Sequence, residues 1–290
     1  MNIDYSTYPK GHTLDRKRFV FEEWLRGSFR EGLWRGEQLR PVRRSVLIAF
    51  TSLHYSDDLD ALLRYDAAGI APLLFIGSPD GYRRSKQKTT RGWEIAVIEA
   101  RPAGEMLNDV GLLTAGEVVR LGLSMCDTIV AWAERATITR GLCPATVYVA
   151  GDQGQRRFTG ATPRSFLVLG SEGMNTDFPN HAYDAPSDNA ALDATLDDAA
   201  FTVAMILWFA LLREHPYDVP GHPHQYDNIW NDIRRPFTGP PELGRLLEAV
   251  LVADVAKRMK TDEFRVELAK LARAWNVDLP PFPPPGLADS

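Results

Sequence analysis

The sequence predicts an α+β protein with two parts, a small β-rich lobe followed by a larger helical lobe. Residues 19–100 contain short runs of β-branched, aromatic and aliphatic residues separated by polar turns, as strands do. Residues 101–278 carry longer patterns with helical spacing, arranged around one almost wholly apolar run. We expect residues 1–18 to be a flexible lead-in and the proline-rich residues 279–290 to be an extended or disordered tail.

Composition places the chain among ordinary globular proteins. Its 290 residues are enough for a sizeable core, and 44% of them are hydrophobic. The net charge of −5 argues against a nucleic-acid-binding surface. Two isolated cysteines, Cys126 and Cys143, do not form a disulfide framework and are expected to be packed thiols. We therefore expect a cytoplasmic protein without a membrane span.

The first lobe is predicted to be a small antiparallel sheet with one helix. Two strands joined by a turn near Gly27 and Ser28 are expected within residues 19–39. A helix is expected at about 56–66, where Ser56 can cap the first turn. Three further strands are predicted at 44–50, 70–78 and 93–100, with the polar loop 79–92 between the last two.

The second lobe is predicted to be mainly helical. Thr114 and Glu117 have the spacing of a capping box and open a helix that runs to about Arg135. Short strands are expected at 145–150 and 155–160. Helices are expected further on at 226–235, 241–253 and 261–275.

The apolar run Ala199–Leu212 is predicted to be the central helix of this lobe. It has no polar face, so it should be buried on all sides, and its 14 residues fall short of a bilayer span. Asp197 and Asp198 stand where carboxylates satisfy the free N–H groups of a first turn. Arg213 is expected in the last turn, with Pro216 ending the helix.

Seven segments, in the same order along the chain, resemble the motifs of the protein-kinase superfamily. They cover residues 20–275 and imply a bilobal protein-kinase-like fold. They are the Gly-rich loop at 25–33, the strand of the ATP-contacting lysine at 45–50, the turn after the first helix at 67–77, the hinge at 97–107, the catalytic loop at 138–149, the end of the activation segment at 183–188 and the late arginine motif at 254–259.

The residues that carry kinase chemistry are replaced at most of these positions. Two glycines of the phosphate loop fall at Leu25 and Arg30, which leaves only Gly27. The lysine that neutralises phosphate charge falls at Ala49, and its glutamate partner falls at Asp58. Side chains at the loop and an uncharged residue on the strand should both weaken contact with phosphates.

The catalytic loop and the metal site are altered in the same way. The aspartate that accepts the substrate proton falls at Gly141, although the preceding arginine is kept as Arg140. The metal-binding asparagine falls at Thr146, and the metal-binding aspartate falls at Gly160. The glutamate that closes the activation segment falls at Ser187, so Arg258 would lack its usual partner and would find another carboxylate or be exposed.

The resemblance and these departures together imply a pseudokinase, a catalytically inactive protein that works as a protein-binding scaffold or allosteric regulator. No cofactor or metal is expected, and ATP binding should be weak or absent. The alternative is a divergent phosphotransferase or a nucleotide-sensing module that uses the interlobe cleft, which apolar residues would line (Val46, Ile98 and Val147). The candidate polar residues for such a cleft do not pair at a catalytic spacing: Glu99, Glu105, Asp109, Asp152 and Arg140.

Candidate partner-binding residues lie in the activation-segment region, at Asp184 and Ser187, and in the stretch IWNDIRRPF further along the chain, at Trp230 and Phe237. Core packing is the competing explanation for the two aromatic residues. The long acidic segment 170–197 is the favoured surface. Three histidines could bind a metal or belong to a solvated loop: His215, His222 and His224.

Overall fold

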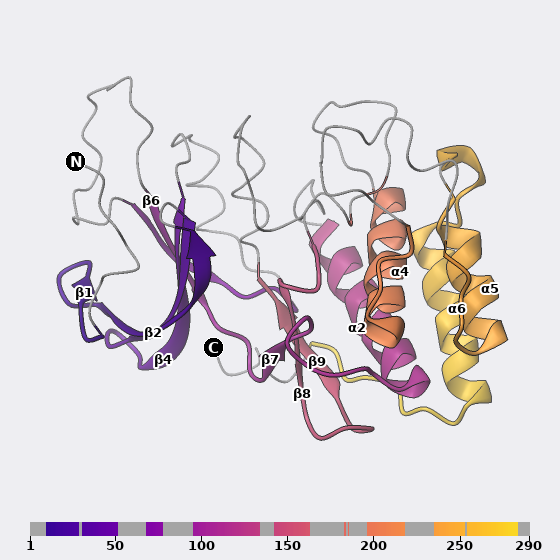
Figure 1. The fold of residues 1–290 in the computed structure, drawn as a ribbon, viewed down its shortest axis with the longest axis horizontal. Coiled ribbons are helices and arrows are strands. Elements are labelled where there is room, and N and C mark those ends of the chain that lie inside the picture. Colours follow the sequence, from indigo (N-terminus) through magenta and orange to yellow (C-terminus); the bar gives the residue numbers. More distant parts are fainter. Residues whose placement is uncertain are drawn as a thin grey trace.

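A computed structural model describes residues 10–28, 31–51, 68–77, 95–133, 142–162, 183, 185, 196–217, 235–252 and 254–283. It confirms the α+β class. A curled antiparallel sheet forms one end of the molecule, a small second sheet lies in the middle, and the helices form the other end (Figure 1).

The larger sheet has six antiparallel strands in the order β1-β2-β3-β4-β6-β5. Its strands are β1 (Thr13–Leu14), β2 (Phe19–Ser28), β3 (Glu31–Gln38), β4 (Arg44–Thr51), β5 (Leu73–Gly77) and β6 (Ile95–Ala100). Five of them were predicted from the sequence. The pairing of β2 with β3 shifts register twice, and such bulges increase the local twist of a sheet.

The two faces of this sheet are both buried, by different sets of residues. Trp34 and Ile48 belong to an aromatic-rich cluster in which Phe21 and Trp24 meet the Trp34 ring edge to face, at centroid distances of 5.1 and 5.0 Å. The neighbouring residues Leu33, Leu47 and Ala49 point to the opposite face, as the alternation of a strand requires.

The second sheet has three antiparallel strands in the order β7-β8-β9. They are β7 (Glu105–Met106), β8 (Val147–Ala150) and β9 (Arg157–Ala161). The sequence predicted β8 and β9, whereas β7, like β1, is two residues long and was not predicted.

The helical end is built around α4, which the other helices pack against. The helices are α2 (Ala115–Ala133), α4 (Leu196–Leu212), α5 (Pro241–Val250) and α6 (Thr261–Ala274), with a short 3₁₀ turn, η5 (Val255–Lys257), before α6. In α4 the side chains of Phe201, Leu207 and Trp208 are fully buried, so the prediction of a helix surrounded by protein is confirmed.

The capping box predicted for the start of α2 is present. The backbone N–H and the hydroxyl of Thr114 both donate to the Glu117 carboxylate, at 2.7 and 2.9 Å. The Glu117 N–H donates back to the Thr114 hydroxyl at 3.3 Å. This reciprocal pair satisfies backbone donors that a helix start leaves open.

Several predicted elements fall outside the described residues. They are the helix at 56–66, the polar loop 79–92 and all but the last residue of the helix predicted at 226–235. In the part of the chain that the structure describes, no helix is both long enough and apolar enough to cross a membrane.

Candidate functional site

The candidate site is the contact between the larger and the smaller sheet. Leu33 of β3 and Leu47 and Ala49 of β4 pack there against Met106 of β7 and Tyr148 of β8. All five side chains are buried, and that of Tyr148 is fully so. We call these five residues the inter-sheet cluster. They fill the contact with apolar groups from both sheets.

The segment between β6 and β7 holds the two sheets close together. The Arg101 N–H donates to the Ser45 carbonyl at 3.0 Å, and this bond fixes the start of the segment to β4. The Arg101 guanidinium donates to the Gly104 carbonyl at 2.7 Å and lies 6.0 Å from the centre of the Tyr148 ring. Gly104 has a φ of +85°, and a Cβ there would lie 2.1 Å from the Val149 carbonyl oxygen, so only glycine fits.

A second connection joins residues 69–71 to β9. The Ala71 N–H donates to the Ala161 carbonyl at 2.8 Å, and the Ala161 N–H donates to the Gly69 carbonyl at 2.9 Å. Ile70 and Ala161 form a parallel bridge. The two sheets are therefore linked by backbone hydrogen bonds as well as by the inter-sheet cluster.

The resemblance aligns Thr146 with the metal-binding asparagine of kinases. In this chain the Thr146 side chain forms hydrogen bonds within its own turn. Its buried hydroxyl accepts a hydrogen bond from the Cys143 N–H at 3.0 Å and donates to the Cys143 carbonyl at 3.0 Å. Gly160 lies in β9 opposite Tyr148 and brings no side-chain ligand. The neighbouring Thr159 hydroxyl donates to the Ala103 carbonyl at 2.6 Å.

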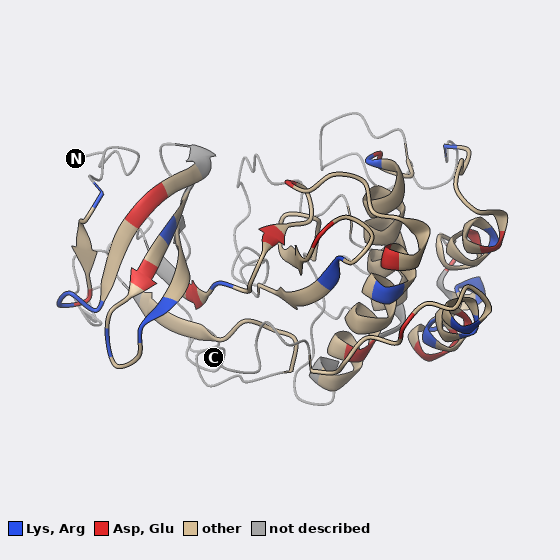
Figure 2. Ribbon diagram, turned by 90° about the horizontal axis from the view of Figure 1, so that it is seen from below, with Lys and Arg blue, Asp and Glu red and all other residues tan. Residues whose placement is uncertain are grey.

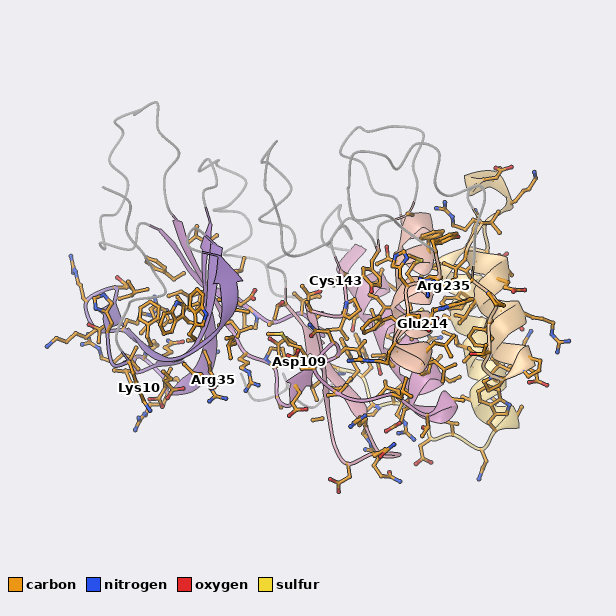
Figure 3. All side chains as sticks on the ribbon, in the orientation of Figure 1. Lys10, Arg35, Asp109, Cys143, Glu214 and Arg235 are labelled. Atoms are coloured by element: carbon orange, nitrogen blue, oxygen red, sulfur yellow. The ribbon has the colours of Figure 1, made fainter. Side chains whose placement is uncertain are left out.

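Among the described candidate carboxylates, only Glu99 lies on the sheet face that forms this contact, because it pairs directly with Leu47. Glu99 is buried in β6 beside Leu47, whereas Glu105 is exposed on β7. Asp109 is exposed beside the small sheet (Figure 3), and Asp152 is exposed in the turn between β8 and β9. Within the described ranges, no group of three or more His, Cys, Asp or Glu residues could hold a metal ion.

None of the three residues expected to line the cleft belongs to the inter-sheet cluster. Val46 and Ile98 lie in the aromatic-rich cluster on the opposite face of the sheet, not with Ala49. Val147 packs into the helical core. The sequence analysis missed Leu33, Leu47 and Tyr148. The alternation of β4 was the available signal, because Leu47 and Ala49 are two residues apart and must share a face.

Other kinase-like positions are described only in part. Ala49 is buried in the inter-sheet cluster. Leu25 is 36% exposed on β2. Gly27 is in β2, paired with Gly32 of β3. The remaining positions lie outside the described residues: Arg30, Asp58, Arg140, Gly141, Asp184 and Ser187.

Arg258 is buried rather than exposed. Its Nε donates to the Val252 carbonyl at 3.0 Å, and its guanidinium lies 4.9 Å from the centre of the Phe201 ring. Phe201 in turn stacks on Tyr217, whose hydroxyl donates to the Leu251 carbonyl at 3.1 Å. The arginine thus connects α4 with the segment that follows α5.

The candidate aromatic partner residue Phe237 is half-buried. Its ring meets Trp208 of α4 edge to face at 4.9 Å, and it lies against Gly239 and Gly244. These contacts favour core packing over docking for this residue. Trp230 lies outside the described residues.

One of the three candidate metal-binding histidines is described. The His215 Nδ1 faces the Tyr217 backbone, 2.9 Å from its carbonyl oxygen and 3.2 Å from its nitrogen. Its ring meets Tyr183 edge to face at 5.3 Å. His222 and His224 lie outside the described residues.

The fold is that of an α+β protein whose two sheets meet through buried apolar side chains. A scan against protein-family models found no match. A search of curated proteins likewise found no match.

Proposed function

We propose that this chain is a catalytically inactive, kinase-like protein that acts by binding another protein, as a scaffold or allosteric regulator. The inter-sheet cluster carries the proposal. The resemblance puts the nucleotide between the strands around the Gly-rich loop and the segment after the hinge. In this chain the two corresponding sheets meet through Leu33, Leu47 and Tyr148, which are buried against one another.

The connectivity supports the kinase-like part of the proposal. The segment that resembles the Gly-rich loop spans the β2–β3 hairpin, and the next strand, β4, carries Ala49 at the lysine position. The hinge-like residues 97–107 lead directly from the larger sheet to the smaller one. The catalytic-loop-like residues end in β8, beside the buried contact.

The side chains at this contact support the absence of catalysis. Phosphoryl transfer depends on a lysine, an asparagine and an aspartate that hold phosphates and metal ions. Here these positions carry Ala49, Thr146 and Gly160. Ala49 and Gly160 offer no polar side chain, and the Thr146 hydroxyl is already engaged within its own turn. Each missing charge-stabilising group ordinarily supplies several kcal/mol.

Nucleotide binding is the first test. The melting temperature would be measured with adenosine, ATP and Mg·ATP, for the native chain and for Leu47→Ala and Ile48→Ala. These two variants remove a similar volume from adjacent residues that face opposite sides of β4. We expect no magnesium-dependent rise with ATP in any of them. Any rise in melting temperature with adenosine should be larger for Leu47→Ala than for the native chain or Ile48→Ala, because only Leu47→Ala opens the inter-sheet contact.

A large rise with Mg·ATP in the native chain would contradict this expectation and would favour a nucleotide-sensing module. Transfer of labelled γ-phosphate to the chain or to a generic protein substrate would favour the divergent phosphotransferase instead. Both results would leave the fold assignment intact.

Partner binding is the second test. We expect the partner to contact segment 170–197, which by the resemblance corresponds to the segment where a kinase meets its substrate. Replacing residues 170–188 by a Gly/Ser linker should abolish capture of the natural partner, while circular dichroism shows a folded chain. The matched control replaces residues 79–92 by a Gly/Ser linker of the same length as the residues that it removes. Unchanged capture by the first variant would contradict the placement of this surface.

A further inference from the structure

Two turns at one end of the larger sheet bring basic residues together. The β1–β2 turn carries Arg16, Lys17 and Arg18, and the β3–β4 turn carries Arg40 and Arg43. We call these five residues the basic end. The Leu39 N–H donates to the Arg18 carbonyl at 2.7 Å, which joins the two turns. Figure 2 shows blue segments at this end of the molecule, beside red segments of the strands.

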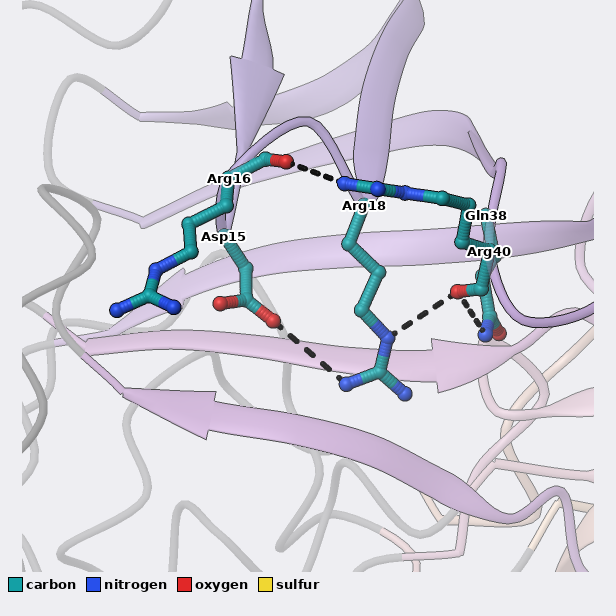
Figure 4. Close-up of polar contacts among 5 residues, drawn as sticks. All are labelled: Asp15, Arg16, Arg18, Gln38 and Arg40. Carbon is teal, nitrogen blue, oxygen red and sulfur yellow. Dashed lines mark hydrogen bonds and ion pairs between the residues drawn. The ribbon is translucent and has the colours of Figure 1, made fainter.

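The hydrogen bonds of the basic end leave much of its charge uncompensated. The Arg40 Nη2 donates to the Arg16 carbonyl at 2.7 Å, and the Arg18 Nε donates to the Arg40 carbonyl at 3.3 Å (Figure 4). Carbonyl groups satisfy a guanidinium without cancelling its charge. Arg18 also lies 3.6 Å from the Asp15 carboxylate. The side chains of Arg18 and Arg40 are thus held in place, and the basic end retains much of its positive charge.

Acidic partners are few around these residues. Arg43 pairs with Glu37 at 2.8 Å, and Glu22 also acts on the charge of Arg43. Among the residues that the structure describes, no carboxylate lies within ion-pair distance of Arg16, Lys17 or Arg40, and all three residues are exposed. This local positive charge contrasts with the net charge of −5 of the whole chain.

The backbone of the β1–β2 turn is held in an unfavourable conformation. Asp15, Arg16 and Lys17 have φ values of 46°, 57° and 66°, a region that non-glycine residues seldom occupy. Such a turn persists only when its surroundings fix it. Here the contacts with the β3–β4 turn fix it, and the Gln38 side chain adds a hydrogen bond to the Arg40 carbonyl at 2.7 Å.

An exposed apolar residue stands beside these charges. Val42, in the β3–β4 turn between Arg40 and Arg43, is 55% exposed, and Pro41 next to it is also exposed. An apolar tip flanked by arginines suits an anionic bilayer, where the basic groups meet headgroup phosphates and the tip enters the interface. A pocket for a phosphopeptide needs converging free donors, whereas Arg40 and Arg43 already donate to Arg16 and Glu37.

We propose that the basic end docks on the anionic lipid headgroups of a membrane surface, with Val42 at the level of the headgroups. The helical end lies at the opposite end of the molecule and would remain in water (Figure 1). This docking does not depend on the kinase-like proposal, because no residue of the inter-sheet cluster takes part in it.

The test is flotation of the full chain with vesicles of phosphatidylcholine alone and with ~30% phosphatidylserine. We expect flotation with the anionic vesicles only, and loss of binding as salt is raised. The double variant Arg16→Gln, Lys17→Gln should weaken binding roughly 30-fold. Val42→Asp should weaken it further. The matched control Arg245→Gln, Arg273→Gln removes the same charge from exposed positions on α5 and α6 and should bind normally.

Absence of flotation with the anionic vesicles would overturn the proposal, and so would equal weakening by the control pair. Competition by soluble inositol hexakisphosphate that is unaffected by Val42→Asp would assign the basic end to a soluble polyanion instead. Melting curves of each variant check that the chain is folded, since the exchanged side chains make no described contacts with the core.

Discussion

Glu117 and Arg120 show how two buried side chains of one helix can join three segments. Its carboxylate accepts hydrogen bonds from Thr114 at the start of α2 and from the Arg156 N–H, at 2.8 Å, in the turn between β8 and β9. Arg120, one turn further along α2, donates to the Arg156 carbonyl at 3.4 Å and to the Asp278 carbonyl at 3.5 Å. The pair therefore attaches the small sheet and the start of the tail to α2.

Glu117→Gln should destabilise the fold at neutral pH, because the amide replaces an ionised acceptor in a buried site. Burial opposes ionisation of Glu117, but the hydrogen bonds from Thr114 and Arg156 outweigh it and lower the pKa of the carboxyl. We expect a loss of about 1–3 kcal/mol in the free energy of unfolding, measured in urea.

The lowered pKa of Glu117 also predicts how the stability of the fold depends on pH. A carboxyl with a lowered pKa in the folded state stabilises that state above the ordinary glutamate pKa. The contribution is lost as the pH falls through the lowered value. The difference between native chain and Glu117→Gln should therefore shrink on acidification. Glu105→Gln, at an exposed position, is the control and should leave the free energy of unfolding at neutral pH unchanged. A difference between the native chain and Glu117→Gln that stays constant at all pH values would contradict the assignment.

At the scale of elements, the end of α4 depends on Arg213. This residue adopts a φ of 58° directly after the helix, and its N–H donates to the Phe209 carbonyl at 2.7 Å. Its guanidinium donates to the Leu107 carbonyl at 2.6 Å and to the Asn108 carbonyl, and lies 4.6 Å from the centre of the Phe209 ring. Burial lowers the pKa of this guanidinium, while nearby Asp109 opposes the shift.

Two substitutions separate the backbone role of Arg213 from its side-chain role. Arg213→Ala leaves the two carbonyls without their donor and should cost about 1–3 kcal/mol of stability. Arg213→Gly loses the same hydrogen bonds but tolerates the left-handed conformation, so it should be more stable than Arg213→Ala by about 1 kcal/mol. Chemical unfolding of the three proteins measures both differences. A glycine variant that is less stable than the alanine variant would show that the backbone conformation contributes nothing.

Most elements could be predicted because local pattern decides them. The period-two pattern of β4 and the capping box of α2 are examples. The strands β1 and β7 could not be predicted, since each is two residues long and exists only through its pairing with β2 or β8. The end of α4 was assigned to Pro216, but the helix ends at Leu212, where Arg213 turns into the left-handed region. That turn depends on carbonyl groups about a hundred residues away in the chain.

The candidate site was less predictable than the elements. The resemblance pointed to Ala49, Thr146 and Gly160 as the residues to compare with those of kinases, but not to what occupies the space between the sheets. Tyr148 illustrates the reason. Its position in a strand follows from the sequence, whereas its contact with Leu33 and Leu47 depends on how the larger sheet is placed on the smaller one. The residues of a contact between sheets are set by this placement, which no local pattern encodes.

At the scale of the whole molecule, the inter-sheet cluster couples the two ends of the chain. Tyr148 contacts the larger sheet from β8, and β8 lies next to the helical core through Val147 and Val149. The hydrogen bonds between residues 69–71 and β9 reinforce this coupling. We therefore expect the described parts to unfold together rather than as two independent lobes.

Hydrogen exchange tests this coupling. Tyr148→Ala removes a fully buried aromatic side chain, which should cost about 3–5 kcal/mol. It should speed exchange in β3, β4 and β8 alike, because these strands share the cluster. Trp34→Ala is the matched control: it removes a buried aromatic side chain from the opposite face of the larger sheet. Where hydrogen exchange proceeds through local opening of the sheet, Trp34→Ala should speed exchange only in β2, β3 and β4. Faster exchange in β8 alone after Tyr148→Ala would show that the two sheets open independently.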